Sequence, residues 1–108
     1  MSPTKPEKKL WAAIAELGCA ACRQEGIKNT HVSIHHISGR TKKGAHAHVL
    51  ALCAGHHQDG AGRDKSMIAV HPYKARFEAE YGTQEHLFNL TFEILAMRGL
   101  WPDGIPVP

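Results

Sequence analysis

Three absences narrow what this 108-residue chain can be before any motif is considered. No apolar run approaches the roughly 20 residues that span a bilayer, and residues 1–4 do not read as a targeting segment, so we expect a cytoplasmic protein without membrane contact. No internal repeat or low-complexity segment occurs. The three cysteines are an odd number, which argues against a disulfide framework and for metal binding in a reducing compartment.

The charge balance of the chain is mild, whereas its histidine content is high. Thirteen Lys and Arg against ten Asp and Glu give a formal net charge of +3, which suits a polyanionic partner without requiring one. Nine histidines are many for a chain of this length. We expect one domain spanning residues 1–108, and a core this small often needs a staple such as a bound metal.

Apolar periodicity and turn residues predict an α+β fold in which a β-hairpin is flanked by helices. Adjacent residues of a strand point to opposite faces, so His35 and His36 are not expected to share one task. The domain core is expected over residues 19–82. The elements that the pattern predicts are a helix over 6–17, strands over 31–37 and 46–53, a short helix over 56–63, helices over 72–81 and 83–98, and loose tails at 1–5 and 100–108.

Four metal-ligand residues occur as two C-x2-[CH] pairs, Cys19 with Cys22 and Cys53 with His56. Thirty residues separate the pairs, and each can place two ligands on one tetrahedral zinc ion. Four protein ligands leave no open position, so this pattern predicts a structural zinc site. The alternative is a pair of structural cysteines with an unrelated third.

Five further histidines fall within 37 residues, and two of them are adjacent in a predicted strand. A single histidine is more often an ordinary surface or core residue. A one-metal nuclease, however, needs imidazoles that hold a divalent cation, a neutral imidazole that activates water and a group that orients this base. The five histidines suit those parts, and they are His35, His36, His48, His57 and His71.

The order of these motifs resembles the HNH endonuclease family, which has a zinc-stapled ββα-metal core. The resemblance implies that His35 binds the catalytic metal, that His36 is the general base and that His57 is a second metal ligand. His48 stands where the family usually has the asparagine that orients the base. His56 stands in for the last zinc cysteine of the family pattern.

Two further segments are similar to the recombination enhancement function (Ref) nucleases of phages and prophages, which cut DNA where a RecA filament is engaged. They are HHISGRT at residues 35–41 and VHPYKARFEAEYGTQEHL at residues 70–87, and the resemblance covers roughly residues 19–95. It implies DNA and a RecA filament as partners. It also implies that His71 is a further ligand of a catalytic Mg²⁺, Mn²⁺ or Zn²⁺. Ala61 and Gly62 occupy the stretch where many HNH proteins carry another ligand.

Basic residues at the expected hairpin tip are the candidates for contact with nucleic acid. Arg40, Lys42 and Lys43 lie there, and Arg63 and Lys65 follow the short helix. Beside a metal and histidine cluster such residues can position phosphates. The competing interpretation for Lys42 and Lys43 is a solvated loop.

The sequence therefore favours a metal-dependent DNA endonuclease that hydrolyses phosphodiester bonds in phage or prophage recombination. The alternative is a zinc-stapled nucleic-acid-binding module without turnover, which the missing Asn favours and the intact His35–His36 pair disfavours. A small transcription-factor-like zinc finger is a third interpretation, although it leaves histidines of the middle strand without a use.

Overall fold

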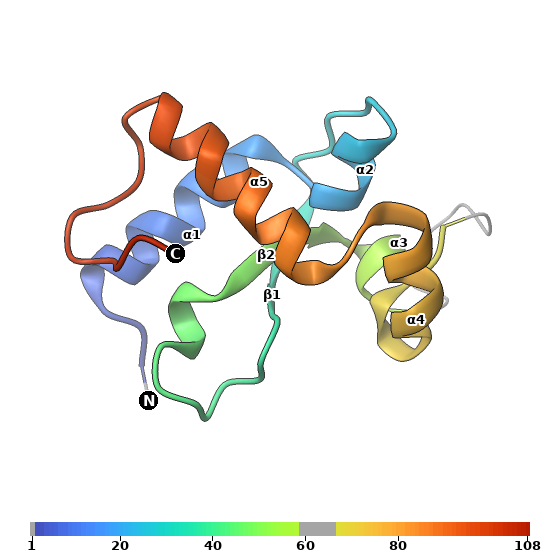
Figure 1. Ribbon diagram of the computed structural model, residues 1–108, viewed down its shortest axis with the longest axis horizontal. Coiled ribbons are helices and arrows are strands. Elements are labelled where there is room, and N and C mark those ends of the chain that lie inside the picture. Colours follow the sequence, from blue (N-terminus) through green and yellow to red (C-terminus); the bar gives the residue numbers. More distant parts are fainter. Residues whose placement is uncertain (1, 59–66) are drawn as a thin grey trace.

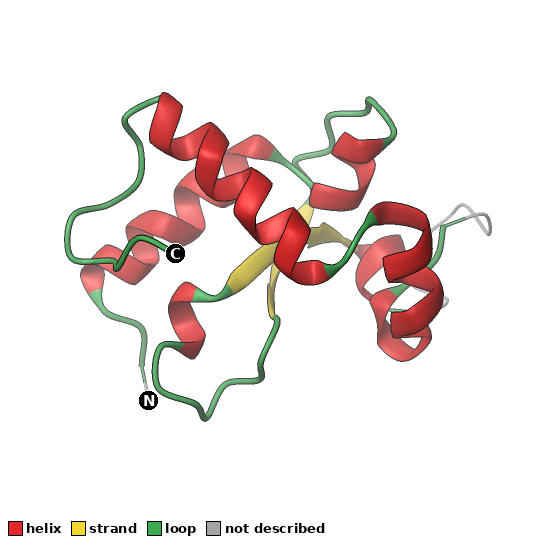
Figure 2. Ribbon diagram, viewed as in Figure 1, coloured by secondary structure: helices red, strands yellow, loops and turns green. Residues whose placement is uncertain are grey.

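Two antiparallel strands form the centre of the fold (Figure 1). β1 (Val32–His36) pairs with β2 (Val49–Cys53) in a register that sets His36 opposite Val49. The structure is a computed structural model, and it describes residues 2–58 and 67–108. The helices around the hairpin (Figure 2) are α1 (Lys5–Leu17), α2 (Ala20–Gln24), α3 (Ala54–His57), α4 (Val70–Tyr81) and α5 (Gln84–Met97). The expected α+β fold with a hairpin and helices is confirmed.

Local capping residues explain where the long helices begin. Thr4 caps α1 in a capping box with Glu7, so this helix starts one residue earlier than predicted. The Thr83 side chain accepts a hydrogen bond from the backbone of His86, which confirms the predicted cap of α5. Among the described residues, no helix is both long and apolar enough to cross a bilayer.

Other segments differ from the sequence-based expectation. The returning strand is shorter than predicted, because Gly44 adopts a left-handed φ of 80° and a 3₁₀ turn, η1 (Ala45–Ala47), follows it. α3 begins two residues before the predicted helix over 56–63 and ends at His57, because the backbone of Gln58 is extended with φ and ψ of −134° and 138°; residues 59–63 of the prediction lie outside the described residues. The C-terminal segment packs against the fold, since Ile105 is buried and its carbonyl accepts a hydrogen bond from Trp101.

β2 is buried along its whole length and separates two apolar clusters. Val49 and Ala51 face the first cluster together with Leu10 and Ile14 of α1. The alternate residues of β2 face the second cluster, which contains Leu50, Leu52, Phe77, Leu87 and the three cysteines. The two-residue period of the strand thus joins α1 on one side to the cysteines and α4 on the other.

The three cysteines and His56 meet in a buried group that fits a metal such as zinc. Tetrahedral zinc would place its ligands about 3.8 Å apart for two sulfurs and about 3.6 Å apart for sulfur and nitrogen. Cys22 Sγ lies 3.8 Å from Cys53 Sγ, and His56 Nδ1 lies 3.2–3.5 Å from each of the three sulfurs. Burial raises the pKa of the Cys22 thiol to about 12, so a cation must displace its proton.

A hydrogen bond on the far side of His56 connects this Cys₃His cluster to α4. His56 Nε2 lies 3.0 Å from the Tyr81 hydroxyl, which also accepts a hydrogen bond from the backbone of Ile68. With Nε2–H donating to Tyr81, the lone pair of Nδ1 faces the sulfurs. Such a partner behind a ligand fixes its tautomer and ring orientation.

Replacing one ligand of the cluster should unfold the protein. A structural zinc site contributes about 10 kcal/mol or more, which rivals the roughly 5–15 kcal/mol that stabilises a whole domain. We expect Cys53→Ser to lose its zinc and its cooperative unfolding transition. Zinc content and circular dichroism on heating measure both effects. His31→Gln is the matched control, because His31 is exposed and outside the cluster. Retention of one zinc and of wild-type stability by Cys53→Ser would contradict the assignment.

Candidate active site

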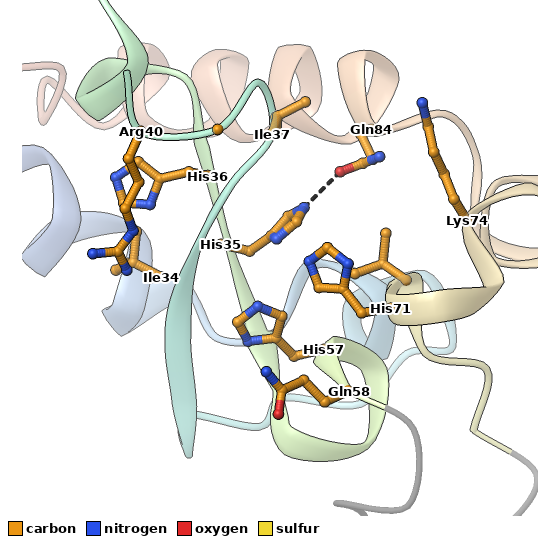
Figure 3. Close-up of a pocket in the computed structure, with 12 residues that line it drawn as sticks. Ile34, His35, His36, Ile37, Arg40, His57, Gln58, His71, Lys74 and Gln84 are labelled. Atoms are coloured by element: carbon orange, nitrogen blue, oxygen red, sulfur yellow. Dashed lines mark hydrogen bonds between the residues drawn. The ribbon is translucent and has the colours of Figure 1, made fainter. Parts of the chain in front are cut away.

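A cleft of about 470 Å³ opens beside β1 (Figure 3). Side chains from the hairpin, the end of α3 and the starts of α4 and α5 line it. Several of the residues predicted for the site are among them. The polar and charged residues that line the cleft are His35, His36, Arg40, His57, Gln58, His71, Lys74 and Gln84.

Three of these residues, His35, His57 and His71, form a group that we call the three-histidine cluster. Each offers a ring nitrogen, and the three nitrogens lie within 4.8 Å of one another. The ring centroids are 5.1–5.6 Å apart, and Figure 3 shows the rings turned toward one another. Imidazole nitrogens that share one ion at about 2.1 Å are at most about 4.2 Å apart, so small ring rotations bring this cluster into coordination distance.

Three different elements deliver the three rings. His35 lies on β1, and His57 is the last residue of α3. A short parallel bridge pairs the backbone of Gln58 with that of His71, which holds the start of α4 beside the end of α3. Because His71 precedes Pro72, it favours extended backbone, and its φ and ψ of −108° and 113° depart from the helical values of α4.

Two polar side chains orient rings of the cluster from behind. Gln84 Oε1 lies 2.7 Å from His35 Nε2, and both residues are buried. With Nε2–H donating to this oxygen, the lone pair of His35 Nδ1 is available to a cation. Ser33 Oγ lies 2.8 Å from His57 Nδ1, so the same arrangement frees Nε2 of that ring. Hydrogen bonds of this kind behind a metal ligand set its tautomer.

Burial controls the protonation of the cluster. It lowers the pKa of His35 to about 4, an effect that the Gln84 hydrogen bond opposes and the His57 and His71 rings reinforce. Burial, followed by the His71 ring, also lowers the pKa of His57. Both rings are therefore neutral at pH 7, which is the form that binds a metal ion.

His36 faces the opposite side of β1, as the strand alternation predicted (Figure 3). Its Nε2 lies 3.0 Å from Nδ1 of His46, and its own Nδ1 is buried without a hydrogen-bond partner in the described structure. The Trp11 ring contacts both imidazoles edge-on and donates a hydrogen bond to the His46 carbonyl. Burial, then the charge of Arg40 and the His46 ring, lowers the pKa of His36.

His48 does not contact His36, contrary to the role expected for it. Its Nδ1 lies 3.2 Å from Ser38 Oγ, and its Nε2 contacts Glu85 of α5. The ring also packs edge-on against Phe88. The imidazole beside His36 is instead that of His46, because the 3₁₀ turn places this residue next to the end of β1.

The predicted basic residues separate into two groups. Arg40 lines the cleft near His36, whereas Lys42 and Lys43 lie exposed in the loop after it and do not line the cleft. Arg63 and Lys65 fall outside the described residues. Lys74 lies three residues after His71 in the sequence. It lines the cleft and was not among the predicted residues.

Sequence reasoning also missed Gln84 and His46. Gln84 directly follows the Thr83 cap, and its place at the start of α5 was predictable, but its contact with a strand 49 residues earlier was not. His46 was expected only as the first residue of the predicted strand over 46–53, without a role in the site. A turn that begins at Gly44 was the available signal that its ring would point elsewhere.

The comparison with known families agrees with this geometry. Residues 3–96 match the family model described as recombination enhancement, RecA-dependent nuclease. The match includes both histidine and cysteine clusters and every residue named above as lining the cleft. The family name indicates a nuclease, and it connects that nuclease to DNA and to RecA. Because the match covers most of its length, this chain belongs to the family of RecA-dependent nucleases of recombination enhancement.

Proposed function

We propose that the protein is a metal-dependent DNA endonuclease of the HNH type, with a ββα-metal core formed by the hairpin and α3. The observation that carries the proposal is the meeting of His35, His57 and His71 in one cleft beside a fourth imidazole, that of His36. A one-metal nuclease needs such a cation site next to a base. Membership of a nuclease family supports the same reaction.

The three-histidine cluster would hold the catalytic divalent cation. Its donor set would be three imidazole nitrogens, which leaves coordination positions open for phosphate and water. A cation bound there would polarise the phosphodiester and stabilise the leaving oxygen. Gln84 and Ser33 orient two of the ligands, and Lys74 at the rim adds positive charge on the side where a phosphate would enter.

His36 would act as the general base. The lowered pKa keeps its ring neutral at pH 7. Because Nε2 contacts His46, Nδ1 would be the nitrogen that takes a proton from the attacking water. His46 holds the ring through the contact between Nδ1 and Nε2, as the family's asparagine is expected to do from another position. Arg40, close enough to lower the pKa of His36, would bind the phosphate beside it.

A nucleic-acid-binding module without turnover is the second candidate. One observation favours it: His48, at the position of the expected asparagine, contacts Ser38 and Glu85 and not the base. The two candidates differ in whether substitution of His36 changes the rate of DNA cleavage.

Removal of the proposed base should slow the reaction. We expect His36→Ala to slow cleavage by about 10²–10⁴-fold, the usual contribution of a positioned base. The measurement is plasmid nicking with Mg²⁺ or Mn²⁺, in the presence of a RecA filament on single-stranded DNA. His31→Ala, which removes an exposed histidine outside both clusters, is the control. Nicking at background level by both wild type and His36→Ala would leave the module without turnover as the function, whereas equal rates above background would remove His36 as the base.

Substitution of two histidines in the same segment should slow cleavage to different degrees. His46→Ala should slow cleavage by about tenfold or more, because the base loses the partner that orients it. His48→Ala should have a smaller effect, since its ring contacts α5. The same nicking assay, with rates followed from pH 6 to 9, measures both. A larger loss of rate for His48→Ala than for His46→Ala would show that His48, and not His46, orients the base.

The hydrogen bond from His35 to Gln84 should contribute to binding of the catalytic cation. Gln84→Leu should weaken binding of the catalytic cation by about 10–100-fold, since loss of a partner behind a ligand typically costs that much. Titration with Co²⁺, read from its visible absorption, measures the affinity after the Cys₃His cluster has been filled with zinc. Gln58→Leu is the matched control, because Gln58 lines the same cleft but is exposed. Equal Co²⁺ affinity in the two variants would remove Gln84 from the site.

A further inference from the structure

A second hollow with a basic lining lies at the other end of α5. Its volume is about 290 Å³, and Leu17, Ile27 and Ile94 form its apolar part. Three cations complete the lining: Arg23 of α2, Lys28 of the following loop and Arg98 just after α5. The hollow thus lies between the end of α1, α2 with its following loop, and the last turn of α5. None of these residues belongs to the cleft described above.

Arg23 is held in an unfavourable position for a cation. Its side chain is half-buried, and its Nε is buried without a hydrogen-bond partner in the described part of the chain. Arg98 lines the same hollow from the end of α5. Two guanidinium groups thus lie near each other in a partly desolvated hollow, an arrangement that an oxyanion between them would stabilise.

Nearby negative charge offsets only part of this positive charge. A zinc ion bound by three thiolates and one imidazole would carry one net negative charge. The charge of Cys19 in that cluster attracts the cation of Arg23. Glu16 borders an adjoining hollow together with Lys28 and Arg98. Within residues 2–58 and 67–108, however, no ion pair joins Glu16 or any other carboxylate to Arg23, Lys28 or Arg98.

We propose that Arg23, Lys28 and Arg98 form a second contact for the DNA backbone, in which they bind one phosphate. The planar fork of arginine matches the oxygens of a phosphate, and the half-buried Arg23 supplies a donor that is oriented before binding. The apolar wall formed by Leu17, Ile27 and Ile94 limits the site to a small anion and strengthens its attraction by excluding water.

The position of this contact fits a substrate that extends beyond the cleft. Gln84 at the first residue of α5 belongs to the cleft, and Arg98 follows the last residue of α5. A helix of 14 residues is about 21 Å long. DNA bound at both ends of α5 would therefore extend several nucleotides from the scissile bond. The identification of the anion as DNA rests on the proposed function, whereas the anion site itself does not.

The test is DNA binding by a double variant, Lys28→Gln with Arg98→Gln, measured by fluorescence anisotropy with labelled duplex and single-stranded 30-mers. Divalent cations are left out, so that binding is measured without cleavage. We expect Kd to rise by about three- to tenfold at low salt, and the slope of log K against log salt to fall by about one per lost phosphate contact. Both residues are exposed, so zinc content and unfolding temperature should stay at wild-type values.

Two matched variants sharpen the result. Lys8→Gln with Lys9→Gln removes the same charge from the exposed face of α1 and should leave the salt slope closer to wild type. Glu16→Gln should instead tighten DNA binding, because it removes the carboxylate that borders the site.

The proposal is overturned if the two double variants bind DNA with the same Kd and salt slope. It is also overturned if the Lys28 and Arg98 substitutions abolish binding of polyglutamate but leave DNA binding unchanged, since the site would then serve an acidic protein segment. Absence of nicking by the wild-type protein would contradict the proposed function without affecting this binding result.

Discussion

The buried Cys₃His cluster is the contact on which the geometry of the cleft depends. It joins the start of α2 to the end of β2 and to the short helix α3, which follows β2 directly in the chain. Through Tyr81 it also reaches α4, the helix that contributes His71. In a domain of this size, the apolar clusters on the two sides of β2 are small, and a metal that binds only the folded arrangement compensates for their limited area.

The cleft combines hydrophobic burial with ionisable groups in a way that favours neutral imidazoles. His35 is buried beside the apolar hairpin, and its partner Gln84 is an uncharged amide that adds no opposite charge to favour protonation. The neutral rings of His35 and His57 attract no anion by themselves. In the proposed function, positive charge near the DNA would come from a bound cation and from residues at the rim such as Arg40 and Lys74.

The sequence allowed the local features to be predicted, and the contacts between distant elements only in part. The spacing of Cys19, Cys22, Cys53 and His56 predicted which residues would meet, because each pair is placed by one turn of backbone. The separation of His35 from His36 followed from the strand period, and Thr83 as a cap followed from helix chemistry. The partners Gln84 and His46 could not be predicted in the same way. The contact of Gln84 depends on how α5 crosses the hairpin, which no short-range pattern encodes. The position of His46 depends on the turn after Gly44, and this glycine signals a turn without specifying which ring the turn brings to His36.

Neighbouring residues of α3 belong to the two clusters that could each hold a metal ion, because His56 lies with the cysteines and His57 with His35 and His71. A helix of four residues has no stability of its own, so its conformation is imposed by what its side chains bind. If both clusters bind metal as proposed, their occupancies would be linked. A cation in one cluster would favour the backbone that the other requires, and by thermodynamic reciprocity each ion would raise the affinity for the other to the same degree. Oxidation of the thiols, which would release the first ion, would thereby also lower the affinity of the cleft for the second.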